Sequence, residues 1–293
     1  MRRNVVRGAI ALCVLSVLWA GSGIGAAVAL TRRARARFEE PTPDGARALR
    51  LRASDGVAIG AWELQGGDGA AIVVTHGNGS ARSAMIEEAQ ALASRGHDVL
   101  AISVRAHGDS EGDVNDVGWS ARRDVIAAVQ HLEREEPSRP VVLLGASLGA
   151  AASVFAAAEL GARVDGLVLV APYADLRDAV ARRTERYLPP LLDGLAYGAL
   201  LLGARVVMPE LDRIRPEASA RAIDRDVPVL VFAGGADRRA PIDDARRITR
   251  ALSRARIVAI EGADHEEMVA RSFERIPEIE ALLHDALARR ATR

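Results

Sequence analysis

Apolar runs that alternate with helical patterns constrain the fold of this chain more than any other feature of its sequence. The apolar runs lie at residues 70–75, 98–104, 140–144, 166–170, 228–233 and 256–260, and the helical patterns lie at 81–95, 118–136, 148–161, 242–253 and 266–290. Buried strands that are connected through helices form parallel sheets, because each crossover helix returns the chain to the same edge. The sequence therefore predicts an α/β fold with a doubly wound, mostly parallel sheet covered by helices on both faces.

A β-hairpin is expected before the first of these runs. Residues 48–53 and 57–64 flank Ser54-Asp55-Gly56, and Asp-Gly is a favoured two-residue hairpin turn. With the six later strands, the hairpin brings the predicted sheet to eight strands.

One interval is too long to be a simple connection. More than fifty residues separate the run that ends at Val170 from the run that starts at Pro228, and they include an apolar stretch from Leu195 to Val207. Connections of this length in compact domains rarely lack secondary structure. We expect a helical cap inserted at about residues 176–226, whose leucines either pack on the sheet or line a pocket.

The N-terminal segment is long enough to cross a bilayer. The 23 residues from Gly8 to Leu30 carry no charge. At about 1.5 Å per residue they form roughly 34 Å of helix, against a hydrocarbon core of about 30 Å. Arginines flank this segment at positions 2, 3 and 7 and at positions 32, 33, 35 and 37. We therefore expect a single-pass membrane anchor over residues 1–37, a linker at 38–47 and a globular domain at 48–293.

A cleaved signal peptide is the alternative for this segment, since Ala27-Val28-Ala29 resembles a cleavage site. The flanking charges are nearly balanced once the amino terminus is counted. They leave open on which side of the membrane the domain lies.

Charge and cysteine content exclude several functions. Seven arginines and no acidic residue lie in residues 1–37, so the remainder carries 32 arginines against 39 acidic residues, a net charge of −7. A domain of this charge has no basic footprint for nucleic acid. Cys13 is the only cysteine and lies in the apolar segment, so the domain has no disulfide, cysteine metal site or cysteine nucleophile.

The pattern most directly tied to chemistry is Gly145-x-Ser147-x-Gly149, which lies between an expected strand and an alanine-rich helical pattern. A serine at a sharp strand-to-helix turn exposes its Oγ, and glycines two residues on either side remove Cβ atoms that would collide. The N-terminus of the following helix directs N–H groups toward developing negative charge. Ser147 is therefore the candidate nucleophile.

From about Leu49 to its end, the chain resembles the α/β-hydrolase superfamily, and within it small serine hydrolases with an N-terminal membrane anchor. The matching segments follow the order of the family: residues 75–79 (THGNG), 105–112 (RAHGDSEG), 145–149 (GASLG), 234–237 (GGAD) and 262–265 (GADH). The resemblance implies the α/β-hydrolase fold, a Ser-His-acid triad and an oxyanion hole. Ser103 and Ala106 depart from the pattern, in which Asp and Gly are frequent.

His265 is the expected catalytic base, because it follows the last expected strand, where the superfamily places its histidine. The other five histidines lie upstream of Ser147, at a strand start or in helical patterns. Asp237 follows the strand at 228–233 and is the expected acid, which would orient His265. Asp175 is the alternative acid, since some relatives of this fold place it after the preceding strand.

Two backbone N–H groups are expected to bind the oxyanion: that of Leu148, and that of Asn78 or Gly79. Gly77 and Gly79 are expected binding residues, because glycines let the backbone approach a substrate carbonyl.

The expected reaction is hydrolysis of a carboxylic ester or thioester through an acyl-enzyme on Ser147, with no cofactor and no metal. The expected partners are a small ester or acyl substrate and, through the N-terminal helix, a membrane, but not nucleic acid. The apolar cap and the anchor favour acyl chains or lipid-borne esters. The same residues would serve a peptidase, an acyltransferase or a perhydrolase, and a catalytically silent, membrane-tethered scaffold is the alternative from another class.

Overall fold

An eight-stranded sheet forms the centre of the protein, of which the computed structural model describes residues 2–33 and 36–292. Its strand order is β1-β2-β4-β3-β5-β6-β7-β8, and only the β1–β2 and β2–β4 pairs are antiparallel. The strands are β1 (Ala46–Arg52), β2 (Ala58–Leu64), β3 (Ala71–Thr75), β4 (Asp98–Ser103), β5 (Val141–Ala146), β6 (Gly166–Val170), β7 (Val229–Gly234) and β8 (Ala255–Ile260). The predicted α/β fold with a doubly wound, mostly parallel sheet is confirmed.

The hairpin of β1 and β2 forms as expected, but the prediction of a two-residue Asp-Gly turn is wrong. The N–H of Ala53 bonds to the carbonyl of Val57 at 2.9 Å, so three residues, Ser54, Asp55 and Gly56, close the hairpin. Gly56 has a φ of +86°, in the left-handed region that glycine adopts at little cost. A three-residue turn with a left-handed last residue matches the twist of the two strands.

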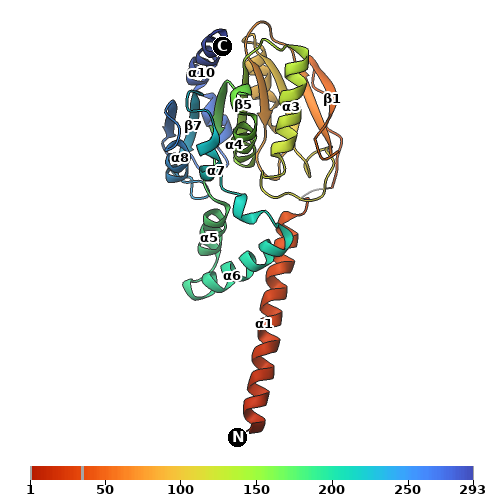
Figure 1. Ribbon diagram of the computed structural model, residues 1–293, viewed down its shortest axis with the longest axis vertical. Coiled ribbons are helices and arrows are strands. Elements are labelled where there is room, and N and C mark those ends of the chain that lie inside the picture. Colours follow the sequence, from red (N-terminus) through yellow and green to blue (C-terminus); the bar gives the residue numbers. More distant parts are fainter. Residues whose placement is uncertain (1, 34–35, 293) are drawn as a thin grey trace.

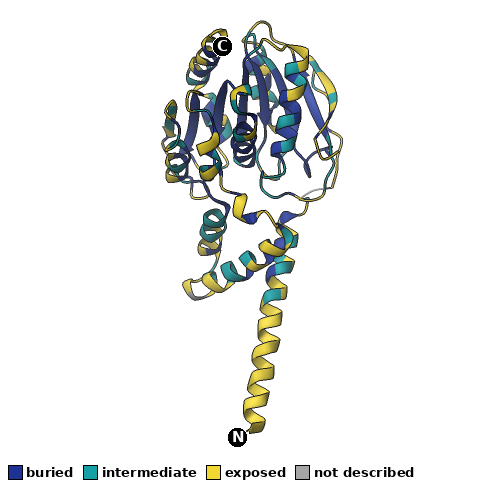
Figure 2. Ribbon diagram, viewed as in Figure 1, coloured by how far each residue is buried: buried dark blue, intermediate teal, exposed yellow. Residues whose placement is uncertain are grey.

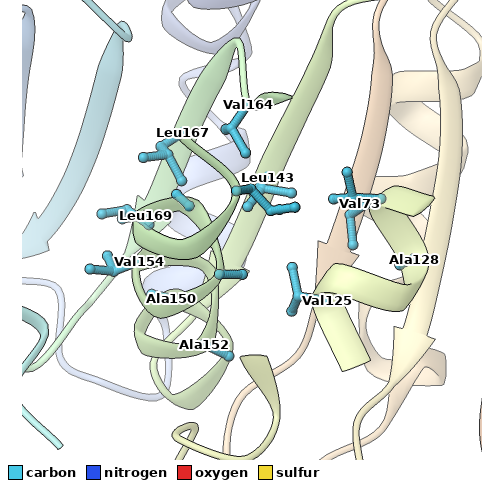
Figure 3. Close-up of a cluster of buried hydrophobic side chains, with 14 of the residues drawn as sticks. Val73, Val125, Ala128, Leu143, Ala150, Ala152, Val154, Val164, Leu167 and Leu169 are labelled. Carbon is cyan, nitrogen blue, oxygen red and sulfur yellow. The ribbon is translucent and has the colours of Figure 1, made fainter. Parts of the chain in front are cut away.

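Helices cover both faces of the sheet (Figure 1). One face carries α3 (Arg122–Glu135), α4 (Leu148–Leu160) and α8 (Ile242–Thr249), and the other carries α2 (Ile86–Ala93), which follows the 3₁₀ turn η1 (Arg82–Met85), α9 (Met268–Phe273) and α10 (Ile276–Ala291). A further 3₁₀ turn, η2 (Gly161–Arg163), follows α4. Figure 3 shows the first face, where Val125 of α3 lies near Leu143 of β5 and Val154 of α4 lies near Leu169 of β6. Full burial of such a side chain contributes roughly 1.5–3 kcal/mol.

The single helical pattern expected at 266–290 is two helices, α9 and α10. Pro277 lies in the first turn of α10, where the missing N–H of proline costs no intrahelical hydrogen bond. In the middle of one long helix the same proline would clash with the preceding turn. The proline therefore sets the break between the two helices.

The residues between β6 and β7, where the cap was expected, fold into helices. These are α5 (Leu176–Tyr187), α6 (Pro190–Val207), η3 (Leu211–Arg213), α7 (Pro216–Ser219) and η4 (Ala220–Ala222). Phe155 of α4 and Tyr173 lie with Met208, Leu211 and Ile214 in one buried cluster. This cluster holds the inserted helices against the body of the protein.

The N-terminal segment forms one long helix, α1 (Arg2–Thr31), which projects from the body (Figure 1). It is long and apolar enough to cross a membrane, with a mean hydropathy of 1.9 over its most apolar window. Figure 2 shows that its N-terminal part is exposed, whereas its C-terminal part meets α6. Arg35, one of the basic residues expected behind the apolar segment, lies outside the described residues, as do residues 1, 34 and 293.

Candidate active site

Ser147 lies at the sharp turn between β5 and α4, with a φ of +51° and a ψ of −108°. A non-glycine residue in such a conformation costs about 1–3 kcal/mol, which the surrounding packing must hold. A Cβ on Gly145 would lie 2.3 Å from the carbonyl oxygen of Gly149, and a Cβ on Gly149 would lie 2.4 Å from that of Thr75. Both glycines are therefore required by close backbone approach, and the turn presents the serine at the C-terminal edge of the sheet.

Three of the predicted site residues, Ser147, His265 and Asp237, are connected by two consecutive hydrogen bonds. The Oγ of Ser147 is 3.0 Å from Nε2 of His265, and Nδ1 of His265 is 2.7 Å from Oδ2 of Asp237. Asp237 follows β7 and His265 follows β8, so two neighbouring parallel strands deliver both side chains to the same edge. This arrangement can withdraw a proton from Ser147 while a carboxylate stabilises the resulting imidazolium.

The environment of Asp237 keeps its carboxyl ionised although the side chain is fully buried. Burial alone would raise the pKa of Asp237, but the hydrogen bonds from His265 and from backbone N–H groups outweigh it and lower the pKa. Its second oxygen accepts from the N–H groups of Arg239 and Ala240 at 2.8 and 2.9 Å. Since Asp237 is an acceptor only, Nδ1 of His265 carries the proton, and the lone pair of Nε2 faces Ser147.

Asp175, the alternative acid, is bonded elsewhere. One of its oxygens accepts from the N–H of Arg177 at 2.8 Å and so caps the N-terminus of α5. The other is 2.7 Å from Nε of Arg215. These two bonds give Asp175 a structural task at the start of the inserted helices.

The loop after β3 passes beside Ser147, since a Cβ on Gly77 would lie 3.7 Å from the Cβ of the serine. Leu148 is the first residue of α4, so its N–H has no acceptor within the helix. The N–H of Gly79 donates to Nε2 of His107 at 3.1 Å. Of the two predicted donors in this loop, Gly79 is thus engaged, which leaves the N–H of Asn78 as the candidate to act with that of Leu148.

Two buried histidines hold this loop, and the sequence did not indicate that role. His107 donates from Nδ1 to the carbonyl of Arg105 at 2.9 Å while its Nε2 accepts from Gly79. His76 donates from Nδ1 to the carbonyl of Gly77 at 2.7 Å while its Nε2 accepts from the N–H of Val104 at 3.2 Å. Burial lowers the pKa of His107, and burial together with the neighbouring His107 lowers the pKa of His76 to about 3.

The segment between α1 and β1 is tied to the loop after β4. The guanidinium of Arg33 donates to the carbonyl oxygens of Gly108, Ser110 and Gly112. The N–H of Asn115 donates to the carbonyl of Thr31 at 2.6 Å. The side chain of Asn115 in turn donates to Oδ1 of Asn78 at 2.6 Å, so the end of α1 is connected to the loop beside Ser147. Sequence spacing carries no signal for such contacts between distant segments.

The two departures from the family pattern have different structural consequences. Ser103 donates from Oγ to the buried carboxylate of Glu40 at 2.6 Å, so Glu40 supplies at this point a carboxylate that the strand lacks. Ala106 adopts a φ of +61°, the left-handed conformation for which glycine is better suited.

A cavity of about 330 Å³ lies against the same loop. It is lined by Phe38, Asn78, Gly79, Ala84, His107 and Glu266, among others. Its volume is at the lower end of the range of about 300–1,000 Å³ typical of small-molecule sites. The cavity reaches Asn78, one of the two candidate oxyanion donors, and Glu266, the residue after His265, while Ser147 and Leu148 are not among its lining residues.

Part of this chain resembles known proteins in sequence. A family model described as serine aminopeptidase, S33 matches residues 68–205. The monoglyceride lipase of Rattus norvegicus is 36% identical over 114 residues, which cover 38% of this chain and 37% of that protein. The chain thus spans little more than a third of the length of the curated monoglyceride lipases that it matches.

Solved structures share the fold over a much larger part of the chain. An esterase from Pyrococcus furiosus is similar with a TM-score of 0.67 at 20% identity, covering 85% of this chain and 97% of the other. A bacterial membrane phospholipase A is similar with a TM-score of 0.61 at 19% identity, covering 98% of this chain and 99% of the other. The chain therefore has the α/β-hydrolase fold.

Proposed function

We propose that this protein is a membrane-anchored serine hydrolase that cleaves carboxylic esters or thioesters of acyl compounds. The observation that carries the proposal is the hydrogen-bonded line from Asp237 through His265 to Ser147, with distances of 2.7 and 3.0 Å. A nucleophile within reach of a base, and a base oriented by a buried carboxylate, are the parts that acyl transfer needs.

In the proposed reaction, Oγ of Ser147 attacks the carbonyl carbon while Nε2 of His265 takes the hydroxyl proton. The bond to the alcohol or thiol then breaks, His265 returns the proton to the leaving group, and an acyl-enzyme remains on Ser147. Water attacks this ester with the same base, and release of the acid restores the serine. Asp237 orients the imidazole and stabilises its cationic form throughout.

The oxygen that becomes negative in each tetrahedral intermediate would be held by the N–H groups of Asn78 and Leu148. Both lie in short segments beside Ser147, and the helix dipole of α4 adds to the donor at Leu148. A single donor of this kind typically contributes about 10²- to 10³-fold in kcat. Gly77 and Gly79 would form part of the binding site, because neither has a side chain that would keep the substrate carbonyl away from this loop.

For the substrate we propose an acyl ester of the monoacylglycerol type. The curated relatives are named monoglyceride lipases, and a small cavity beside the loop suits a short alcohol part such as glycerol. A peptidase is the second candidate, because the matching family is described as a serine aminopeptidase.

We further propose that α1 is an uncleaved, single-pass membrane anchor. Its length and hydropathy allow it to span a bilayer. The similarity to a bacterial membrane phospholipase A covers 98% of this chain, so it extends into α1. Mass spectrometry of the mature N-terminus tests this proposal. A chain that begins at Leu30 would instead identify the segment as a signal peptide.

A substrate panel tests the reaction class. The full-length protein in detergent should hydrolyse monoacylglycerols and p-nitrophenyl esters, with acyl thioesters and aminoacyl p-nitroanilides as the competing classes. Ser147→Ala should abolish the activity. Ser153→Ala is the matched control, since this serine lies in α4 with a buried hydroxyl that has no hydrogen-bond partner. Hydrolysis of the anilides alone would favour the peptidase, and no hydrolysis in any class would favour the silent scaffold.

A further inference from the structure

The apolar face of α6 that meets α1 is the starting observation. Leu192, Leu195, Ala199, Leu202 and Val206 recur every three or four residues and therefore lie on one face of this helix. The four large side chains of this stripe, which we call the α6 stripe, are between 40% and 59% exposed, whereas Ala199 in its middle is buried.

The opposite face of α6 is already occupied by protein. Leu201, Ala204 and Val207 pack against the buried cluster that contains Phe155 and Met208. The α6 stripe is therefore separate from the face of α6 that packs into the core of the cap. It lies on the face of α6 that contacts Trp19 and Gly23 of α1.

Helix α1 crosses the α6 stripe at its middle with direct backbone contact. A Cβ on Gly23 would lie 2.0 Å from the carbonyl oxygen of Ala199, and a Cβ on Gly203 would lie 2.1 Å from that of Gly23. Nε1 of Trp19 donates to the carbonyl of Leu195 at 2.9 Å. Small residues at such a crossing are typical of helices that meet in a bilayer. This contact fixes the position of α6 along the axis of α1.

That contact lies close to the edge of a bilayer. Fifteen residues separate Gly8, the first residue of the uncharged segment, from Gly23. At about 1.5 Å per residue they span about 22 Å of a hydrocarbon core that is about 30 Å thick. With Gly8 at the far boundary of the core, Gly23 and the α6 stripe lie among the acyl chains, about 8 Å from the near boundary with the headgroups.

The groups around the stripe suit this boundary. Tyr187, 65% exposed, lies just before α6, and the guanidinium of Arg186 lies 5.9 Å from its ring centroid. Arg183 on α5 and Arg205 on α6 are also exposed. Aromatic rings and arginines with apolar stems are the residues that gather at membrane interfaces.

We propose that α6 lies in the membrane interface, with the α6 stripe in contact with lipid acyl chains on both sides of α1. This inference rests on the anchoring role of α1 proposed above. The end of α1 is bonded to Asn115 in the loop after β4, and α5 follows β6, so the sheet edge that carries Ser147 faces the cap and the membrane. A substrate that leaves the bilayer would therefore meet α6 before it reaches the site.

Fluorescence quenching by spin-labelled lipids tests the proposal on the full-length protein. The protein is reconstituted in phosphatidylcholine–phosphatidylglycerol vesicles, and single cysteines on a Cys13→Ser background carry an environment-sensitive fluorophore. Leu192→Cys and Val206→Cys report on the α6 stripe, and Val17→Cys reports on α1, about 9 Å deeper than Gly23. Arg134→Cys on α3 is the exposed control.

Labels at Leu192 and Val206 should lose most of their fluorescence to a nitroxide near the headgroup and less to one near the end of the acyl chain. The label at Val17 should show the reverse order, and the label at Arg134 should respond to neither. Unquenched labels at Leu192 and Val206 with a quenched Val17 would overturn the role of α6 alone, whereas an unquenched Val17 would overturn the anchor as well.

Energy transfer between stripe labels of two molecules, without quenching by lipid, would assign the stripe to a second copy of the chain and overturn the proposal. Circular dichroism melting of each labelled protein verifies that it is folded. In a second measurement, Leu192→Gln combined with Val206→Gln should lower the hydrolysis of vesicle-borne monoacylglycerol relative to that of a water-soluble ester. An unchanged ratio would overturn the part of α6 in lipid capture.

Discussion

Acid should destabilise this protein through His76, which is buried in its neutral form beneath the loop beside Ser147. Both ring nitrogens are used by backbone groups, Nδ1 as a donor to Gly77 and Nε2 as an acceptor from Val104. Protonation of Nε2 would place two donors face to face in a buried site. The folded state therefore resists protonation, while the unfolded chain accepts a proton near the ordinary histidine pKa.

The size of the effect follows from the pKa of His76, which is about 3 in the folded protein against 6.5 for the free side chain. A lowered folded pKa means that the unfolded state binds more protons as the pH falls below 6.5, so the free energy of unfolding decreases. Between pH 7 and pH 5 the loss amounts to about 2 kcal/mol. The loss would continue toward pH 3, where the folded state begins to take up the proton as well.

Urea denaturation at pH 7 and pH 5, in one non-ionic detergent, measures this difference. His76→Gln retains an acceptor for Val104 but does not titrate, so its stability should fall by about 2 kcal/mol less over this interval than that of the unaltered protein. His284→Gln is the matched control, since His284 is exposed on α10 and should leave the pH dependence unchanged. An equal loss in His76→Gln and the unaltered protein would refute the reasoning.

Ala106→Gly should stabilise the fold by up to about 1 kcal/mol, because glycine adopts the left-handed backbone at φ +61° without strain; a urea midpoint at or below that of the unaltered protein would count against it. His107→Ala should lower kcat about tenfold or more and change KM less, because the loop that carries Asn78 loses a fixing hydrogen bond; steady-state kinetics with an unchanged kcat would contradict this role. Asp237→Asn should lower kcat by about 10²- to 10⁴-fold, with some activity returning at high pH, because the amide favours the wrong imidazole tautomer. Asp175→Asn should leave kcat unchanged and cost less than about 1 kcal/mol of stability, because the amide oxygen still caps α5 and only the ion pair with the half-exposed Arg215 is lost; the opposite pair of results would move the catalytic acid to Asp175.

The parts of the fold that were predictable are those with a local, periodic signal. Strands buried on both faces appear as continuous apolar runs, and β3 to β8 lie within a residue or two of the expected ranges. The hairpin turn was mispredicted because Asp-Gly serves both two-residue and three-residue turns. A two-residue turn of this type needs a positive φ at both residues, whereas here Gly56 has a positive φ and Asp55 does not. The break before α10 could have been predicted from Pro277. We expected one helix because the helical pattern of apolar residues continues on both sides of this proline.

The candidate site likewise contains residues that the sequence predicts and residues that it does not. Ser147, Asp237 and His265 follow strand ends, and because parallel strands end at one edge, their order along the chain suffices to bring them together. The tasks of His107 and Arg33 could not be predicted, because they arise from side chains that bind backbone groups of segments distant in sequence. Such contacts depend on loop conformation, for which residue spacing carries no information.

The most direct test of the proposed chemistry is to locate the residue that reacts with a fluorophosphonate, since this reagent forms a covalent bond only with an activated nucleophile. The full-length protein is labelled, digested and analysed by mass spectrometry. We expect the adduct on Ser147, with labelling abolished in Ser147→Ala and retained in the control Ser153→Ala. An adduct on another residue, or undiminished labelling of Ser147→Ala, would contradict the account.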